Sequence, residues 1–214
     1  MPMLYDYFRS SASFRVRIAL ELKGIAHDRF QVHLVRDGGE QHAPSYRALN
    51  PAGLVPVWSD ESGLLSQSLA IVEYLEETAP EPALLPRAPA DRAWVRSLAL
   101  SVACDIHPLN NLRVLKYLER ELGASEDARK AWYAHWVEDG LASVEAMLTA
   151  HPAASAFAFG ETATLADVCI VPQVANALRF ACKLSHVPRV RALYDHCMTQ
   201  PAFQRAAPEP AEPA

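Results

Sequence analysis

Three serines stand within four residues near the N-terminus, directly before an apolar run of helical period. Ser10, Ser11 and Ser13 precede the run Phe14–Lys23. The N-terminus of a helix carries unpaired N–H groups and about half a positive charge, so it stabilises an anion. A free thiol has a pKa of about 8.5, and a serine O–H donated to its sulfur favours the thiolate. These serines are candidates for activating a thiol, and simple N-capping of the helix is the alternative.

The dipeptide Val55–Pro56 is a second candidate, because a proline here precedes a predicted strand. Proline cannot donate to a β-ladder, and an X–Pro bond is where the cis form costs least. A cis Pro56 would turn the backbone N–H and C=O of Val55 outward, where they can pair with an extended peptide. An ordinary trans proline at a sheet edge is the alternative that the local sequence leaves open.

Two further motifs stand at predicted helix starts. Gln67 and Ser68 open the helix-like run to Glu77, where Ser68 can cap the helix and the helix N-terminus can hold a carboxylate. Taken alone, a Gln-Ser pair before a helix indicates a cap. Thr164 and Asp167 have the form of a capping box, so we interpret Asp167 as a folding element.

A proline also interrupts a helix-like pattern in the second half of the chain. Pro108 predicts a kink, and the polar residues His107, Asn110 and Asn111 cluster beside it. A lone histidine on a helix is commonly structural, so this cluster becomes a candidate pocket only when its residues are considered together.

The elements that position these residues change type along the chain. Strands alternate with helices up to residue 79, a segment rich in proline and alanine follows at 80–91, and 92–206 is helical throughout. We predict an α/β domain at 1–79, a linker at 80–91, an all-helical domain at 92–206 and a disordered tail at 207–214. The expected strands are 3–8, 28–35, 52–58 (after a turn) and 64–65, and the expected helices are 14–23, 68–77, 91–118, 126–149, 164–182 and 188–198.

Composition excludes several classes of protein. The 214 residues carry a net charge of −5, which argues against a protein dominated by nucleic-acid binding. No apolar run approaches the roughly 18 residues of a membrane span, and the N-terminus lacks the layout of a signal peptide, so we expect a cytoplasmic protein without membrane contact. The four cysteines form no C-x-x-C pair, so neither a metal site nor dithiol chemistry is predicted.

The motifs resemble those of the zeta-class glutathione transferases over nearly the whole chain. Residues 10–20 match the class signature Ser-Ser-Cys-Ser-x-Arg-Val-Arg-Ile-Ala-Leu, except that Ala12 stands where the cysteine usually is. Further matches are Val55–Pro56, the pattern Gln-Ser-x-Ala-Ile from Gln67, and His107–Leu115. The resemblance implies an N-terminal thioredoxin-like α/β domain, a C-terminal all-α helical bundle and a homodimer.

The same resemblance assigns roles to individual positions. Ser10 is implied as the residue that activates the thiol of glutathione, with Ser11 beside it, and Pro56 is implied to be cis. Arg9 and Arg179 are implied to bind the carboxylates of the substrate. The residues implied to bind glutathione are Ser10, Ser11, Gln41, Val55, Pro56, Gln67, Ser68, His107, Asn111 and Arg113.

The activity implied is the cis–trans isomerisation of a maleyl-type dicarboxylic acid, with glutathione as cofactor. A thiolate that adds to a cis double bond leaves a single bond that rotates, and elimination then restores a trans bond and the thiol. Leu112 stands where related maleylpyruvate isomerases often carry an arginine, which favours maleylacetoacetate as substrate. The alternatives are maleylpyruvate isomerisation, glutathione conjugation of α-haloacids, and a non-catalytic glutathione-binding module.

Overall fold

The computed structural model describes residues 1–208, so the predicted tail from Glu209 onward lies outside the described residues. The chain forms two compact units. One contains residues 1–84 and the segment from Gln200, and the other contains Leu85–Thr199. The helix at the end of the described chain therefore belongs with the first unit and not, as the sequence predicted, with the helical domain.

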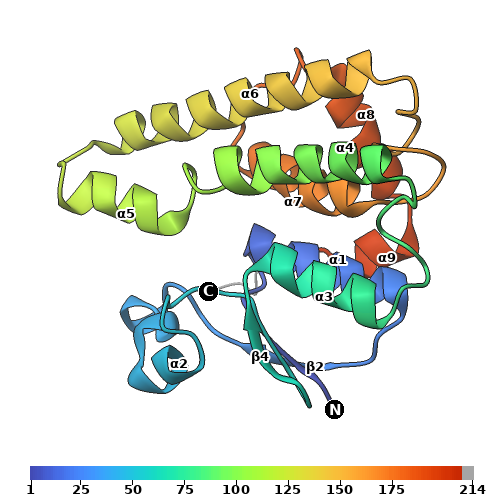
Figure 1. The fold of residues 1–214 in the computed structure, drawn as a ribbon. Helices are drawn as coiled ribbons and strands as arrows, with labels where there is room; N and C mark the ends of the chain where they lie inside the picture. Colours follow the sequence, from blue (N-terminus) through green and yellow to red (C-terminus); the bar gives the residue numbers. More distant parts are fainter. Residues whose placement is uncertain (209–214) are drawn as a thin grey trace. The chain divides into compact units, whose positions relative to one another are not determined.

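A four-stranded sheet in the order β2-β1-β3-β4 is the centre of the first unit. β1 pairs in parallel with β2 and antiparallel with β3, which pairs antiparallel with β4. Helices α1 and α3 pack together beside the sheet, and α9 packs on α1 (Figure 1). The elements are β1 Met3–Asp6, α1 Ser11–Lys23, β2 Asp28–Gln31, α2 Pro44–Leu49, β3 Val57–Asp60, β4 Gly63–Ser66, α3 Ser68–Thr78 and α9 Pro201–Ala206.

The first helix ends at Lys23, as predicted, but begins at Ser11, three residues before the predicted Phe14. The Ser10 hydroxyl accepts a hydrogen bond from the Ser13 N–H, and Gly24 closes the helix in the left-handed region at φ 64°. Strand β2 is shorter than the predicted 28–35, because its partner β1 ends at Asp6 and the His33 N–H donates to the Glu40 carboxylate instead of a strand. Helix α2 was not predicted from the sequence, although it opens with proline at its first position.

All the regular elements of the second unit, Leu85–Thr199, are helices. Helix α7 is buried along most of its length and packs against α4 and α8, while α6 packs against α8, α5 and the π-helical segment η3. Its elements are α4 Pro89–Leu100, η3 Ser101–Ile106, α5 Leu112–Arg120, α6 Glu126–Ala150, α7 Leu165–Arg179 and α8 Pro188–Cys197. At the start of α7, the buried Asp167 carboxylate accepts from the Thr164 N–H and hydroxyl and from the Ala158 N–H, as a capping element does.

The single helix predicted over 91–118 is wrong. Helix α4 ends at Leu100, the chain continues through η3, and a turn at 107–110 separates it from α5. Pro108 has no N–H and clashes with the carbonyl four residues earlier, so it ends the helical run. Asn111 then caps a new helix by accepting from the Arg113 N–H.

None of the helices formed by residues 1–208 combines the length and hydropathy that crossing a membrane would demand.

Candidate functional site

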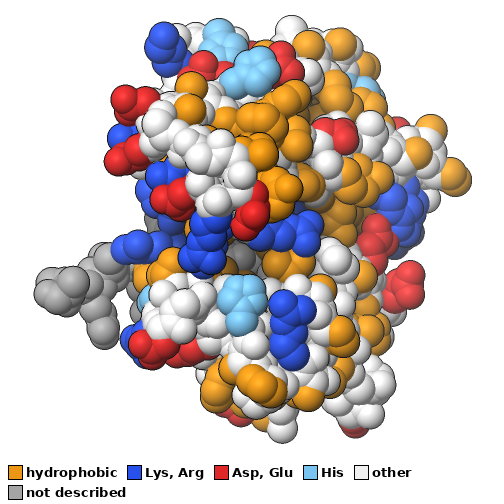
Figure 2. All heavy atoms as spheres, turned by 90° about the vertical axis from the view of Figure 1, so that its left-hand side faces the viewer, with side chains coloured by type: hydrophobic (Ala, Val, Ile, Leu, Met, Phe, Trp, Pro, Cys, Tyr) orange, Lys and Arg blue, Asp and Glu red, His pale blue; other side chains and the backbone are white. Residues whose placement is uncertain are grey.

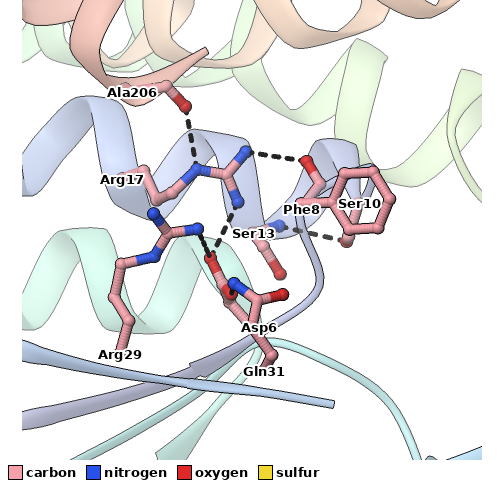
Figure 3. Close-up of polar contacts among 8 residues, drawn as sticks. All are labelled: Asp6, Phe8, Ser10, Ser13, Arg17, Arg29, Gln31 and Ala206. Atoms are coloured by element: carbon pink, nitrogen blue, oxygen red, sulfur yellow. Dashed lines mark hydrogen bonds and ion pairs between the residues drawn. The ribbon is translucent and has the colours of Figure 1, made fainter. Parts of the chain in front are cut away.

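The N-terminus of α1 presents a hydroxyl with an uncommitted donor. The Ser10 Oγ accepts from the Ser13 N–H at 3.2 Å, and the Ser10 N–H donates to the Tyr7 carbonyl at 2.8 Å (Figure 3). Within residues 1–208 the Ser10 O–H has no acceptor, so it is available to an incoming group. Ser10 is half-buried, and Ser11, the first residue of the helix, is buried.

The electrostatics at this helix end favour an anion. The first turn of α1 contains no acidic residue. The Ala12 N–H, in the same turn, finds no acceptor in the described part of the chain. An O–H, a free N–H and the positive end of a helix therefore converge on the place where the sequence predicted a bound thiolate.

The peptide bond between Val55 and Pro56 is cis, which confirms the prediction. Val55 is buried in a hydrophobic cluster with Tyr7, Tyr46 and Val57. The carbonyl of Leu54 accepts from the Tyr46 hydroxyl and from the Asn50 amide, each at 2.8 Å, which anchors the loop. The backbone N–H and C=O of Val55 make no hydrogen bond to any other described residue, so they can pair with an extended peptide.

The start of α3 forms a second helix N-terminus in this unit. Gln67 has φ 74° and ψ 116°, a conformation that a residue with a Cβ rarely adopts and that is found most often at functional sites. Its side chain is exposed, and Ser68 behind it is buried. The Ser68 hydroxyl accepts from the Arg15 guanidinium at 3.3 Å.

Arg15 was missed by the sequence analysis, although a signal was present. It is only 2 % exposed and extends from α1 to the first residue of α3. Arg15 and Arg17 are two arginines in a run otherwise dominated by apolar residues, and a buried cation in a helix requires polar partners.

The side chain of Gln41 is buried within its own loop and does not face solvent. Its amide nitrogen donates to the Leu34 carbonyl at 3.3 Å. Gly39 has φ 114°, and a side chain on it would collide with Gln41. The contact between Gln41 and glutathione therefore remains a prediction.

In the second unit, the structure brings His107 and Asn111 together. His107 Nε2 lies 3.4 Å from the Asn111 amide nitrogen, across the turn made by Pro108. The indole N–H of Trp132 donates to the Leu109 carbonyl at 2.7 Å and fixes this turn. Arg113 is exposed in the first turn of α5.

The two arginines predicted to bind substrate are both exposed and lie in different units. The Arg9 guanidinium lies over the Phe8 ring at 5.1 Å and directly precedes Ser10. Arg179, at the end of α7, lies over the Phe180 ring at 4.8 Å. Phe180 in turn packs on Tyr133 with ring centroids 4.1 Å apart, and burial raises the pKa of that tyrosine, while the nearby Arg179 cation opposes the rise.

Basic side chains form local clusters on the surface, although the chain as a whole is acidic. On the face drawn in Figure 2, Lys and Arg side chains gather at several points beside acidic and hydrophobic ones. A net charge of −5 is therefore compatible with local positive charge that attracts an anionic ligand.

A thioredoxin-like sheet with a serine-capped first helix and a cis proline, combined with a helical unit, defines the architecture of a glutathione transferase. Residues 9–78 match the family described as Glutathione S-transferase, N-terminal domain. The chain is 48% identical over 214 residues to the maleylacetoacetate isomerase of Pseudomonas aeruginosa PAO1, with 99% of each chain covered.

Two solved structures are similar along their whole length. One is the holo form of a maleylpyruvate isomerase, described as a bacterial glutathione-S-transferase of the zeta class, with 45% identity, a TM-score of 0.93 and 96% of each chain covered. The other is a maleylacetoacetate isomerase from Methylobacterium extorquens AM1 with bound malonate and GSH, with 38% identity, a TM-score of 0.94 and coverage of 99% of this chain and 100% of the other. The present chain belongs to the zeta class of the glutathione transferase family.

Proposed function

We propose that this chain catalyses the glutathione-dependent cis–trans isomerisation of maleylacetoacetate to fumarylacetoacetate. The observation that carries the proposal is the Ser10 hydroxyl, which keeps an unused O–H donor at a helix N-terminus without acidic residues. The similarity to a maleylacetoacetate isomerase along the whole chain supports the choice of reaction.

The residues of the first unit fit glutathione. The unpaired N–H and C=O of Val55 suit the backbone of the cysteinyl residue, which would pair with them as a neighbouring strand does. The N-terminus of α3, with Gln67 and Ser68, suits the γ-glutamyl carboxylate. We therefore assign the cysteinyl backbone and the γ-glutamyl carboxylate of glutathione to these residues of the first unit.

Glutathione supplies a thiolate that adds reversibly to the double bond and allows it to rotate. The chain's own task at this point is to keep that sulfur ionised near neutral pH. Ser10 donates a hydrogen bond to it, and the N-terminal dipole of α1 adds a favourable potential. Ala12 offers no thiol of its own, so the nucleophile is not a protein cysteine at this position.

Arg9 and Arg179 are proposed to bind the two carboxylates of the substrate. The planar guanidinium matches a carboxylate with two parallel hydrogen bonds, which a lysine ammonium cannot provide. The malonate bound in the Methylobacterium extorquens structure is a dicarboxylate, which supports this class of ligand. His107, Asn111 and Arg113 are proposed to complete the contacts to glutathione.

Maleylpyruvate is the second candidate substrate, since a maleylpyruvate isomerase is 45% identical to this chain. Conjugation of α-haloacids and glutathione binding without catalysis are the remaining alternatives. The test is to incubate the purified chain with maleylacetoacetate or maleylpyruvate, with and without glutathione. We expect isomerisation of maleylacetoacetate that requires glutathione and does not consume it, whereas consumption of glutathione would indicate conjugation instead.

The family resemblance also supports a cytoplasmic homodimer. Light scattering on the purified chain, expected to give twice the mass of one protomer, tests the dimer, and fractionation of cells tests the location.

A further inference from the structure

One arginine of α1 joins three segments of the first unit that are far apart in sequence. Arg17 is 3 % exposed. Its Nη1 donates to Asp6 Oδ2 at 2.8 Å, its Nη2 to the Phe8 carbonyl at 3.2 Å and its Nε to the Ala206 carbonyl at 2.8 Å (Figure 3). A single guanidinium therefore holds the end of β1, the turn before Ser10 and the last residue of α9.

The turn that leads from β1 to α1 is short and held at several points. Phe8 lies midway between Asp6, which ends β1, and Ser10, which caps α1. The Ser10 N–H donates to the Tyr7 carbonyl, and the Ser10 hydroxyl accepts from the helix. Because Arg17 fixes the carbonyl of Phe8, it fixes the path of the backbone into Ser10 and hence the direction of the Ser10 hydroxyl.

Helix α9 supplies the third point of attachment from the other end of the chain. Phe203 and Ala206 are buried, and Arg205 Nε donates to Glu21 Oε2 at 2.7 Å, which holds α9 along α1 (Figure 1). The last carbonyls of a helix have no partner within the helix, and a cation there is favourable. Arg17 satisfies the carbonyl of Ala206 in this way.

The geometry points to Arg17 as a positioning residue that, together with α9, orients the Ser10 hydroxyl toward the thiol. This inference rests on the proposed role of Ser10. Asp6 is completely buried and also accepts from Arg29 at 3.1 Å and from Gln31 at 3.0 Å, so the Arg17 charge stays paired inside the protein. The role requires an arginine, because its Nε, Nη1 and Nη2 donate to three different partners. A lysine at this position could keep the ion pair with Asp6 but not all three contacts.

The test uses Arg17→Lys, with Arg29→Ala as the matched control. Arg29 shares the Asp6 carboxylate, whereas the hydrogen bonds to the carbonyls of Phe8 and Ala206 come from Arg17. The first readout is the pKa of the thiol of bound glutathione, followed by thiolate absorbance in the ultraviolet as a function of pH. We expect Arg17→Lys to raise this pKa toward the value of about 8.5 for a free thiol, and Arg29→Ala to leave it unchanged.

The second readout needs no glutathione. Amide hydrogen exchange in residues 7–13 should become faster in Arg17→Lys and stay as in the wild type in Arg29→Ala. If Arg17→Lys does not fold, Arg205→Ala in the full chain takes its place, because it removes the contact with Glu21 that holds α9 along α1 and should raise the thiol pKa in the same direction. Arg191→Ala, which removes an exposed ion pair on α8, is its control.

The outcomes separate this inference from the proposed function. If the wild-type chain does not bind glutathione or does not lower its thiol pKa, the role of Ser10 fails. If the wild type lowers the thiol pKa and a folded Arg17→Lys variant lowers it equally, Ser10 keeps its role and the positioning role of Arg17 is wrong.

Discussion

The guanidinium of Arg15 donates a hydrogen bond to the hydroxyl of Ser68 at 3.3 Å, linking the middle of α1 to the first turn of α3. Arg15 is 2 % exposed, so its charge acts in surroundings that screen it poorly. The N-terminus of α3 thus receives positive potential from two sources, its own dipole and this cation. A carboxylate bound beside Ser68 benefits from both.

We therefore predict that Arg15→Met weakens the binding of glutathione. A charge-assisted contact contributes roughly 1.5–3 kcal/mol, so the Kd should rise by about 10–150-fold, and Arg15→Lys should recover part of the loss. Calorimetric titration with glutathione measures the Kd, and thermal unfolding shows whether the variants are folded. A folded Arg15→Met variant with an unchanged Kd would contradict the electrostatic role.

Ser10→Ala should lower the isomerase rate at neutral pH by about 10–150-fold, the value of one hydrogen bond to a charged group. The rate should recover as the pH rises, because the thiol then ionises without help. The substitution also removes the N-cap of α1, which costs about 0.5–2 kcal/mol of stability. Steady-state kinetics as a function of pH measure the effect.

Ser125→Ala is the matched control for this cap. Ser125 caps α6 by accepting from the Ala128 N–H at 3.2 Å, the same distance as between Ser10 and Ser13. The Ser125→Ala variant should lose a similar amount of stability, while the pH dependence of its isomerase rate should stay as in the wild type. If both variants lose activity alike, the loss in Ser10→Ala is an effect of stability.

The first helix and its end at Lys23 could be predicted from the sequence, because a serine cap, an apolar period and a terminal glycine are local signals, although the helix begins three residues before the predicted Phe14. The cis proline at Val55–Pro56 needed the family resemblance, since the local sequence left both isomers open. The break at Pro108 was recognised as a kink, but its extent was not, because the π-helical segment before it packs against α6 and α7, and the local sequence does not encode such tertiary contacts.

The contacts that hold the candidate site together were beyond prediction from the sequence. Arg17 reaches Ala206 across 189 positions, and no local pattern encodes such a pair. The segment Pro201–Ala206 is short, so its helix forms only because Phe203 and Ala206 are buried in the first unit. Tertiary packing therefore decided both the last helix and the partner of Arg17.

The stability of the fold should depend on pH through Asp167. Burial raises the pKa of this carboxyl from 3.8 to about 6, although hydrogen bonds from Thr164 and Ala158 oppose the rise. The folded chain then binds the proton more tightly than the unfolded chain, so the free energy of unfolding falls as the pH rises from about 4 to about 6. The contribution is roughly 3 kcal/mol over this window.

Chemical denaturation between pH 4 and pH 7 measures this dependence. Asp167→Asn removes the titrating group, so the difference between wild type and variant should change across the window. Asp28→Asn, in the exposed strand β2, should follow the wild type throughout. Parallel curves for wild type and Asp167→Asn would show that the carboxyl does not titrate differently in the folded state.

The last prediction concerns the recognition of the dicarboxylic substrate by Arg9 and Arg179. Both guanidinium groups are exposed and lie over the ring of a neighbouring phenylalanine. Arg9 has no acidic partner within residues 1–208. Arg9→Ala should lower kcat/KM for the dicarboxylate by about 10–150-fold while leaving the Kd for glutathione nearly unchanged. Arg179→Ala should act in the same direction but more mildly, and lysine at either position should rescue only in part, because it keeps the charge and loses the two parallel hydrogen bonds.

Arg191→Ala is the control, since this exposed arginine pairs with Asp195 on α8 and is assigned no role in the site. Steady-state kinetics beside a direct glutathione titration distinguish the outcomes: an unchanged rate removes the arginines from the substrate site, and a collapse of glutathione binding assigns them to the cofactor instead.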